Sequence, residues 1–119
     1  MSVVLGRTRL FRVNRAGNEE KISIPMEDAF HRYLEYHQFV GSKENTIRWL
    51  RITLRPFIRF LAGNYEGISR PGQVSGEHLR DYLAALRPTN QTVSLNNKIR
   101  AIKAFFSYLH REGYVVRNP

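Results

Sequence analysis

The segment from residue 92 to residue 119 constrains the fold more than any other part of the chain. Along it, apolar residues recur at helical spacing: Leu95, Ile99, Ile102, Phe106 and Leu109. This spacing places them on one side of an α-helix, and that side must be buried against other elements. The pattern therefore predicts an amphipathic helix that starts near Thr92 and stops at Asn118-Pro119, because proline cannot continue a helix.

The opposite side of this predicted helix carries polar groups suited to nucleic acid. They are Thr92, Asn96, Arg100, Lys103 and Ser107. Asparagine can bond adenine with two hydrogen bonds and arginine can do the same with guanine, whereas lysine and hydroxyl groups more readily meet phosphate. Taken alone, Asn96 and Asn97 are more often capping or solvent-facing residues than base readers. Their position beside Arg100 raises the expectation that the two asparagines read bases, but a capping or solvent-facing role remains the more common one.

A second predicted helix, from Glu44 to about Ala62, carries a stripe of positive charge. At about 100° per residue, four arginines fall within a sector of roughly 80°: Arg48, Arg51, Arg55 and Arg59. An adjacent sector is apolar and can face a core: Ile47, Leu50, Leu54, Ile58 and Leu61. An ordinary solvated face, which is the alternative, mixes both signs of charge, but no acid lies between Glu44 and Glu66.

Three other residues of this helix predict local features of its shape and packing. Pro56 removes a hydrogen bond and predicts a bend between residues 52 and 56. The alternative is that such a bend curves the arginine stripe along a DNA groove. Trp49 and Phe60 lie on a third side of the helix, and we expect both to be buried against the preceding helix. An exposed partner surface is the other interpretation.

The remaining elements follow from periodicity and from turn residues. Residues 26–40 form an apolar stripe at helical spacing, with Pro25 before it and Gly41 after it. A shorter helix is predicted from a capping Ser75 to Leu86. Residues 1–25 alternate loosely and predict a short hairpin or a disordered arm. The expected fold is all-α: a compact bundle of four main helices over residues 26–119.

Composition favours a single domain with a negatively charged partner. The chain has 119 residues, a net charge of +9 and a pI near 10.5, which is typical of proteins that bind polyanions. Fifteen of its nineteen cationic residues are arginine, which suits bidentate contacts to phosphate or guanine. Ribosomal and membrane-surface proteins share this charge. The absence of cysteine excludes disulfides and fits the cytosol, and no apolar run approaches the ~18 residues that a membrane span requires.

Catalytic and cofactor motifs are missing from the sequence. The four histidines form no HExxH pattern and no metal-ligand cluster, and the chain has no P-loop or GxGxxG. We expect no cofactor and no metal. The six tyrosines are interpreted as core or rim residues rather than as nucleophiles.

Two segments resemble a known family. Residues 92–119 combine a threonine at the helix start, an asparagine a few residues on, AIKAFF, Tyr-Leu, Arg-Glu-Gly and Asn-Pro. Residues 46–61 match at Thr46, Ile47, Arg48, Arg51, Leu54, Arg55, Phe57, Arg59, Phe60 and Leu61. In this order the two helices resemble the N-terminal SAM-like core-binding domain of tyrosine recombinases (phage integrases). Leu50, where the family usually has tyrosine, and Pro56 depart from the pattern, and residues 1–25 lie outside the resemblance.

The resemblance implies a domain that docks on duplex DNA at a recombination site, in the cytoplasm of a bacterium or archaeon. The helices that start near residues 44 and 92 would approach the major groove, and the helix at 26–40 would help to contact a neighbouring protomer in a synaptic complex. The family's catalytic domain begins just after the Asn-Pro pair, so we expect this fragment to lack it and to be no enzyme alone; no histidine here has arginine three positions later. The rival interpretation is a basic adaptor for RNA or an acidic protein.

The expected DNA contacts fall into two groups, one on each of these helices. They are Lys43, Thr46, Arg48, Arg51, Arg55 and Arg59 in the first group, and Thr92, Asn96, Asn97, Arg100 and Lys103 in the second.

Overall fold

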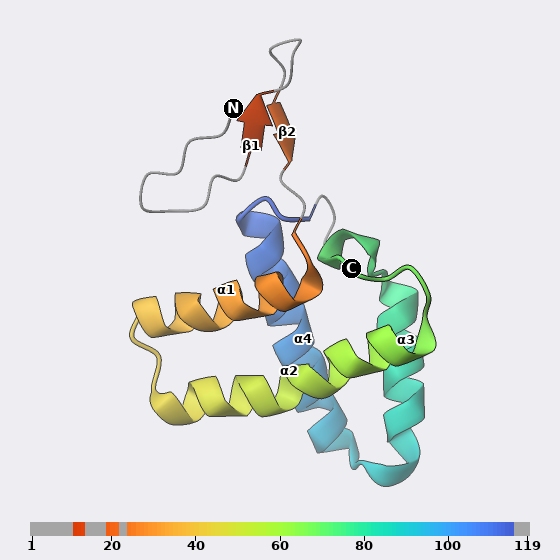
Figure 1. Cartoon of the computed structure of the whole chain (residues 1–119). Helices are drawn as coiled ribbons and strands as arrows, with labels where there is room; N and C mark the ends of the chain where they lie inside the picture. The colour runs from red at the N-terminus through yellow and green to blue at the C-terminus, as the bar shows by residue number, and fades with distance from the viewer. Residues whose placement is uncertain (1–10, 14–18, 22–23, 116–119) are drawn as a thin grey trace.

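The computed structural model describes residues 11–13, 19–21 and 24–115, and within them the chain forms four α-helices (Figure 1). These are α1 (Met26–Phe39), α2 (Glu44–Asn64), α3 (Gly76–Leu86) and α4 (Thr92–Arg111). Short 3₁₀ turns precede and follow α3, at Pro71–Gln73 and Arg87–Thr89. The all-α prediction is confirmed, and each helix starts at or within one residue of its expected position.

A small antiparallel hairpin precedes the helices. Strand β1 (Phe11–Val13) pairs with β2 (Glu19–Lys21), with Phe11 opposite Lys21 and Val13 opposite Glu19. Of the two alternatives for the N-terminal arm, the hairpin is therefore confirmed. Figure 1 shows it apart from the four helices.

The helices pack in two directions around one aromatic core. In Figure 1, α1 and α2 lie side by side and run antiparallel, while α4 crosses behind them and α3 flanks the end of α2. Four fully buried phenylalanines meet where these helices cross: Phe30, Phe57, Phe105 and Phe106. The rings of Phe30 and Phe105 pack edge to face at 6.5 Å, as do those of Phe57 and Phe106. Edge-to-face packing suits the charge distribution of aromatic rings, so this contact fixes the crossing of α4 over α1 and α2.

The apolar stripe predicted for α2 forms part of this core. Ile47, Leu50, Leu54, Ile58 and Leu61 are all buried. Helix α2 continues through Pro56 to Asn64, two residues beyond the expected end. Pro56 itself is exposed, and the bend expected there stays a prediction.

The end of α4 differs from the prediction. The helix stops at Arg111 instead of at Asn118-Pro119, because Gly113 adopts a positive φ of 82° that reverses the chain. The N–H of Tyr114 then bonds to the carbonyl of Leu109 at 2.9 Å. The side chains of Tyr114 and Val115 turn back into the core. Residues 116–119, including the Asn-Pro pair, lie outside the described residues.

Three apolar residues also lie elsewhere than predicted. Trp49 is 45% exposed, not buried against α1, because its sector of α2 faces the start of α4. Phe60 is half-buried, but on the α3 side, with its ring 5.1 Å from that of Tyr82. Val40 is 52% exposed because α1 ends one residue earlier and the chain turns at Gly41, whose φ is 82°.

Candidate nucleic-acid interface

The outward side of α2 is strongly basic. Arg48, Arg51 and Arg59 are exposed, and Lys43 and Thr46 are exposed at the start of the helix. The only acid within α2, Glu44, lies 3.9 Å from Arg48, one turn away. Ion pairs on an exposed surface contribute little free energy, so a phosphate group could displace Glu44 at small cost.

Arg55 differs from the other three arginines of the stripe. Its Nη1 donates to both carboxylate oxygens of Glu27 on α1, at 2.6 and 2.9 Å. Its guanidinium also lies over the ring of the fully buried Phe30, with Cζ 4.7 Å from the ring centre. These contacts hold α1 against α2. The predicted DNA contact by Arg55 stays a prediction, and in it a phosphate would compete with Glu27 for the guanidinium.

A hollow of about 460 Å³ lies beside the arginines, where α1 turns into α2. It is lined by Gln38, Ser42, Glu44, Ile47, Arg48 and Arg51. His37 supports the turn, since its Nδ1 lies 2.8 Å from the hydroxyl oxygen of Ser42 and its ring packs edge to face on Tyr33 at 4.7 Å. Burial lowers the pKa of His37 below its usual 6.5, so this histidine is neutral at physiological pH.

The second group of predicted residues shares the outward side of α4. Thr92, Asn96, Asn97, Arg100 and Lys103 are all exposed. The residue that precedes the helix is Gln91, so Asn96 and Asn97 lie inside it and do not cap its start. The chain has no acid between Asp81 and Glu112. Helix α4 is therefore acid-free along its whole length, as α2 is beyond Glu44.

The fold brings the two acid-free helices together at one depression of about 270 Å³. Trp49 and Thr53 of α2 line it together with Gln91, Val93, Ser94, Asn97 and Lys98 at the start of α4. The sequence pattern did not reveal that the two helices meet here. Val93 and Lys98 were not predicted as interface residues, and for Trp49 an exposed partner surface was the alternative to burial. Each helix pattern was visible separately, but the angle at which the helices cross depends on the packing of their core residues.

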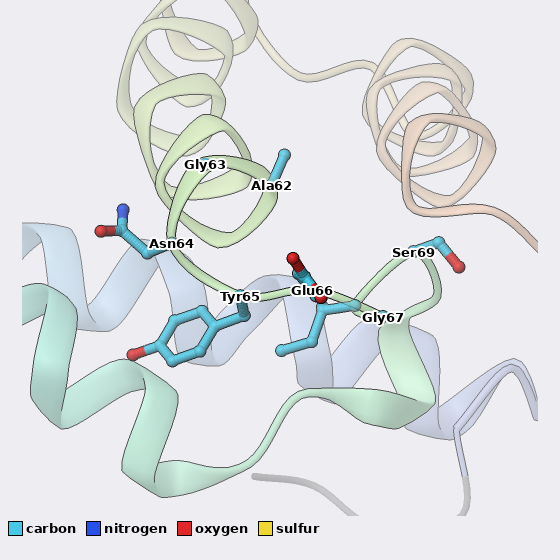
Figure 2. A pocket seen from close by; sticks show the side chains of 8 residues that line it. Ala62, Gly63, Asn64, Tyr65, Glu66, Gly67 and Ser69 are labelled. Atoms are coloured by element: carbon cyan, nitrogen blue, oxygen red, sulfur yellow. The ribbon is translucent and has the colours of Figure 1, made fainter.

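A wider hollow, of about 530 Å³, lies in the loop after α2 and is shown in Figure 2. All the residues that line it come from the continuous segment 62–69. The Tyr65 hydroxyl donates to Asp81 of α3 at 2.5 Å, and this bond, more than burial, raises the pKa of Tyr65 to about 12. The carbonyl of Ser69 accepts from the N–H of Met26 at 2.8 Å. The loop therefore connects the ends of α1, α2 and α3.

The described structure supports no catalytic role for the tyrosines. Four of the six are buried and the other two, Tyr36 and Tyr65, are half-buried. The pKa of Tyr33 and that of Tyr108 are raised to about 12, mainly by burial. A raised pKa disfavours the phenolate form that a nucleophile needs.

Among the described residues, no group of histidine, cysteine and carboxylate side chains could hold a metal ion. No helix there is long and apolar enough to cross a membrane.

These features define a class of protein: a basic all-α domain in which two crossing helices, α2 beyond Glu44 and α4, contain no acidic residue. A family model described as "Phage integrase, N-terminal SAM-like domain" matches residues 28–113. The chain therefore belongs to this family, the SAM-like N-terminal domains of tyrosine recombinases.

Individual relatives agree with the family match. The chain is 31% identical over 93 residues to "Tyrosine recombinase XerC" of Oceanobacillus iheyensis, and 33% identical over 90 residues to a "Tyrosine recombinase" of Agathobacter rectalis. These matches cover 77% and 73% of this chain but only 29% and 27% of the relatives. A crystal structure, the N-terminal domain of a phage integrase/site-specific recombinase from Haloarcula marismortui, covers 83% of this chain and 100% of its own. Its TM-score is 0.71 at 22% identity, which supports the SAM-like fold.

Proposed function

We propose that this domain binds duplex DNA at the recombination site of a tyrosine recombinase, with the outward sides of α2 and α4 against the DNA. One observation carries the proposal: α2 beyond Glu44 and α4 contain no acidic residue, and these two helices meet at an exposed surface. A surface of one charge sign attracts a polymer of the opposite sign over a long range. The neutralisation of phosphates by lysine and arginine then supplies much of the affinity.

The two helices contribute different contacts. Lys43, Thr46, Arg48, Arg51 and Arg59 meet the phosphates and set the position of the domain, because contacts to the DNA backbone carry little sequence information. Asn96 and Arg100 lie on α4 with the side chains to reach base edges in the major groove. Thr92, Asn97 and Lys103 flank them.

The proposal extends to the intact recombinase. A catalytic domain of the same protein would cover the other face of the DNA and supply strand cleavage, and α1 would contact a neighbouring protomer in the synaptic complex. The recombinase would act on DNA in the cytoplasm of a bacterium or archaeon. This segment alone would then leave supercoiled plasmid intact. Nicking that is abolished by the exchange of one tyrosine for phenylalanine would contradict that division of labour.

Fluorescence anisotropy of a labelled duplex, titrated with the chain at several salt concentrations, tests the proposal. We expect dissociation constants of about 10⁻⁴ to 10⁻⁶ M at physiological salt, and a steep loss of affinity as salt rises. Arg51→Ala should weaken binding and lower the salt slope by about one unit. Arg80→Ala, which removes an exposed arginine from α3, is the matched control and should change neither.

Two results would contradict the proposal. One is an absence of binding at low salt, and the other is an equal loss of affinity from Arg51→Ala and Arg80→Ala. Titration of duplex RNA of the same length separates the rival function. The narrow major groove of A-form RNA does not admit an α-helix, so tighter binding to RNA would favour an RNA adaptor.

A further inference from the structure

Large apolar side chains are exposed where α2 meets the start of α4. Trp49 is 45% exposed, Ile52 64% and Val93 69%. Trp49 and Val93 line the same α2–α4 depression, and Ile52 lies one helical turn from Trp49 on α2. Contiguous apolar groups on a protein surface commonly mark a binding site. Trp49 was expected to be a core residue, and the function proposed above does not use it.

The charges around this apolar surface select the kind of partner. Arg48 is the chain neighbour of Trp49, and Lys98 lines the depression itself. Arg100 lies two turns after Val93 and so shares its side of α4. A second copy of the chain, docked here through the same surface, would bring these cations against each other and would be repelled. A polyanion that also presents apolar groups fits the surface.

Duplex DNA presents such a group in the major groove, the C5 methyl of thymine. An A·T base pair shows this methyl beside the N6 and N7 groups of adenine, which an asparagine amide can bond. The α2–α4 depression holds the matching set, since the apolar Trp49 and Val93 lie around it together with the exposed amide of Asn97.

We propose that Trp49 and Val93 form an apolar contact for thymine methyl groups and that Asn97 bonds the paired adenine. The α2–α4 depression then determines the specificity of the domain for A·T base pairs. The inference rests on the proposed DNA-binding function and deepens it: arginines of α2 position the domain, Asn96 and Arg100 reach base edges, and the α2–α4 depression adds a contact specific for A·T base pairs.

The chain offers a direct probe, because Trp49 is its only tryptophan. Titration of an A·T-rich duplex into the 119-residue chain should change the Trp49 emission and reduce its quenching by acrylamide, a neutral quencher. Anisotropy of the labelled duplex, measured in parallel, reports binding independently of Trp49. If anisotropy shows saturable binding while the acrylamide quenching of Trp49 is unchanged, the inference is overturned and the proposed function stands. If no binding occurs at low salt, both fail.

Replacement of thymine by uracil, which lacks the C5 methyl, tests the apolar contact itself. We expect the parent chain to bind the uracil duplex about fourfold more weakly for each buried thymine methyl that is removed. Trp49→Ala and Val93→Ala should bind both duplexes with nearly equal affinity. Val93→Ala alters a mostly exposed side chain, so folding is preserved even if Trp49→Ala is unstable.

Phe39→Ala is the matched control, because Phe39 is 89% exposed at the end of α1 and lies outside the depression. This variant should retain the discrimination of the parent between thymine and uracil. Equal discrimination in the parent, Trp49→Ala and Val93→Ala would overturn the inference. So would a dimer of the free chain, seen by sedimentation, in which Trp49 is protected from acrylamide.

Discussion

The contact between Arg55 and Glu27 gives two neighbouring arginines of α2 different tasks, and a substitution can separate them. The sequence pattern treats Arg51 and Arg55 alike, as phosphate contacts in the middle of a stripe. In the structure, Arg51 is exposed, whereas the Arg55 side chain is 30% exposed and bound to Glu27. We therefore predict that Arg55→Ala destabilises the fold and that Arg51→Ala does not.

The size of the effect follows from the two interactions that Arg55→Ala removes. The Glu27 side chain is 53% exposed, so the ion pair contributes about 0.2–1 kcal/mol. The guanidinium over the Phe30 ring adds about 1 kcal/mol in a partly buried setting. In Arg55→Ala the Glu27 carboxylate still contacts water, so the substitution leaves no buried charge without a partner. Arg55→Ala should lower the free energy of unfolding by about 1–2 kcal/mol in total.

Urea unfolding followed by circular dichroism measures this quantity, because a domain of this size is expected to unfold in one step. Glu27→Gln is the control that removes the ion pair and keeps the contact with Phe30, so it should cost about 0.5 kcal/mol. Arg51→Ala, at an exposed position, should stay within about 0.5 kcal/mol of the parent. A double-mutant cycle between Glu27 and Arg55 gives their coupling directly.

The result that would refute this reasoning is an equal and small change in stability for Arg51→Ala and Arg55→Ala. DNA binding provides a second comparison. Arg51→Ala should lower the salt slope by about one unit, whereas Arg55→Ala should lower it less, because Arg55 is already neutralised by Glu27. Equal salt slopes for the two variants would instead support the phosphate contact that the sequence pattern predicted for Arg55.

The remaining predictions concern three other sites. The pKa of His37 is lowered in the folded state, so the unfolded state takes up a proton first as pH falls below 6.5. The free energy of unfolding should therefore decrease there and level off below the folded-state pKa. Urea unfolding of the parent and of His37→Gln tests this, and a stability difference between them that stays constant with pH would contradict it. Tyr65→Phe removes the hydrogen bond to Asp81 and should lower the free energy of unfolding by about 1 kcal/mol. Ultraviolet titration should then show one fewer tyrosine that ionises near pH 12. An unchanged number of tyrosines ionising near pH 12 would contradict this. Asn96→Ala and Arg100→Ala should each cost about 1–3 kcal/mol on a selected cognate site and less on random duplex; equal losses would make α4 a backbone clamp.

Local periodicity predicted the helices and most of the core correctly. The stripe predicted for α2 is buried throughout, and on α4 the residues Leu95, Ile102, Phe106 and Leu109 are buried as expected. This success has a simple cause. A helix in a small all-α domain must bury one continuous side, so spacing alone identifies most of the residues that face inward.

Periodicity did not reveal contacts between residues far apart in the chain. Arg55 is separated from Glu27 by 28 positions, so its sector on α2 does not reveal its partner. Trp49 was expected to be buried because it is large and apolar, but its surroundings depend on where α4 begins. The end of α4 is a different case. Arg-Glu-Gly at residues 111–113 is a stop signal visible in the sequence, since glycine commonly ends helices, and the predicted end at Asn118-Pro119 is wrong.

If α2 and α4 together form the DNA-binding surface, amide chemical-shift mapping will locate bound DNA on these two helices. Heteronuclear NMR spectra of the isotope-labelled chain would be recorded during titration with a short duplex at low salt. We predict the largest shifts in α2 from Lys43 to Arg59 and in α4 from Thr92 to Lys103, with small changes in α3 and in the loop at residues 62–69. Large shifts confined to α3 and that loop, with α2 and α4 unaffected, would contradict the account.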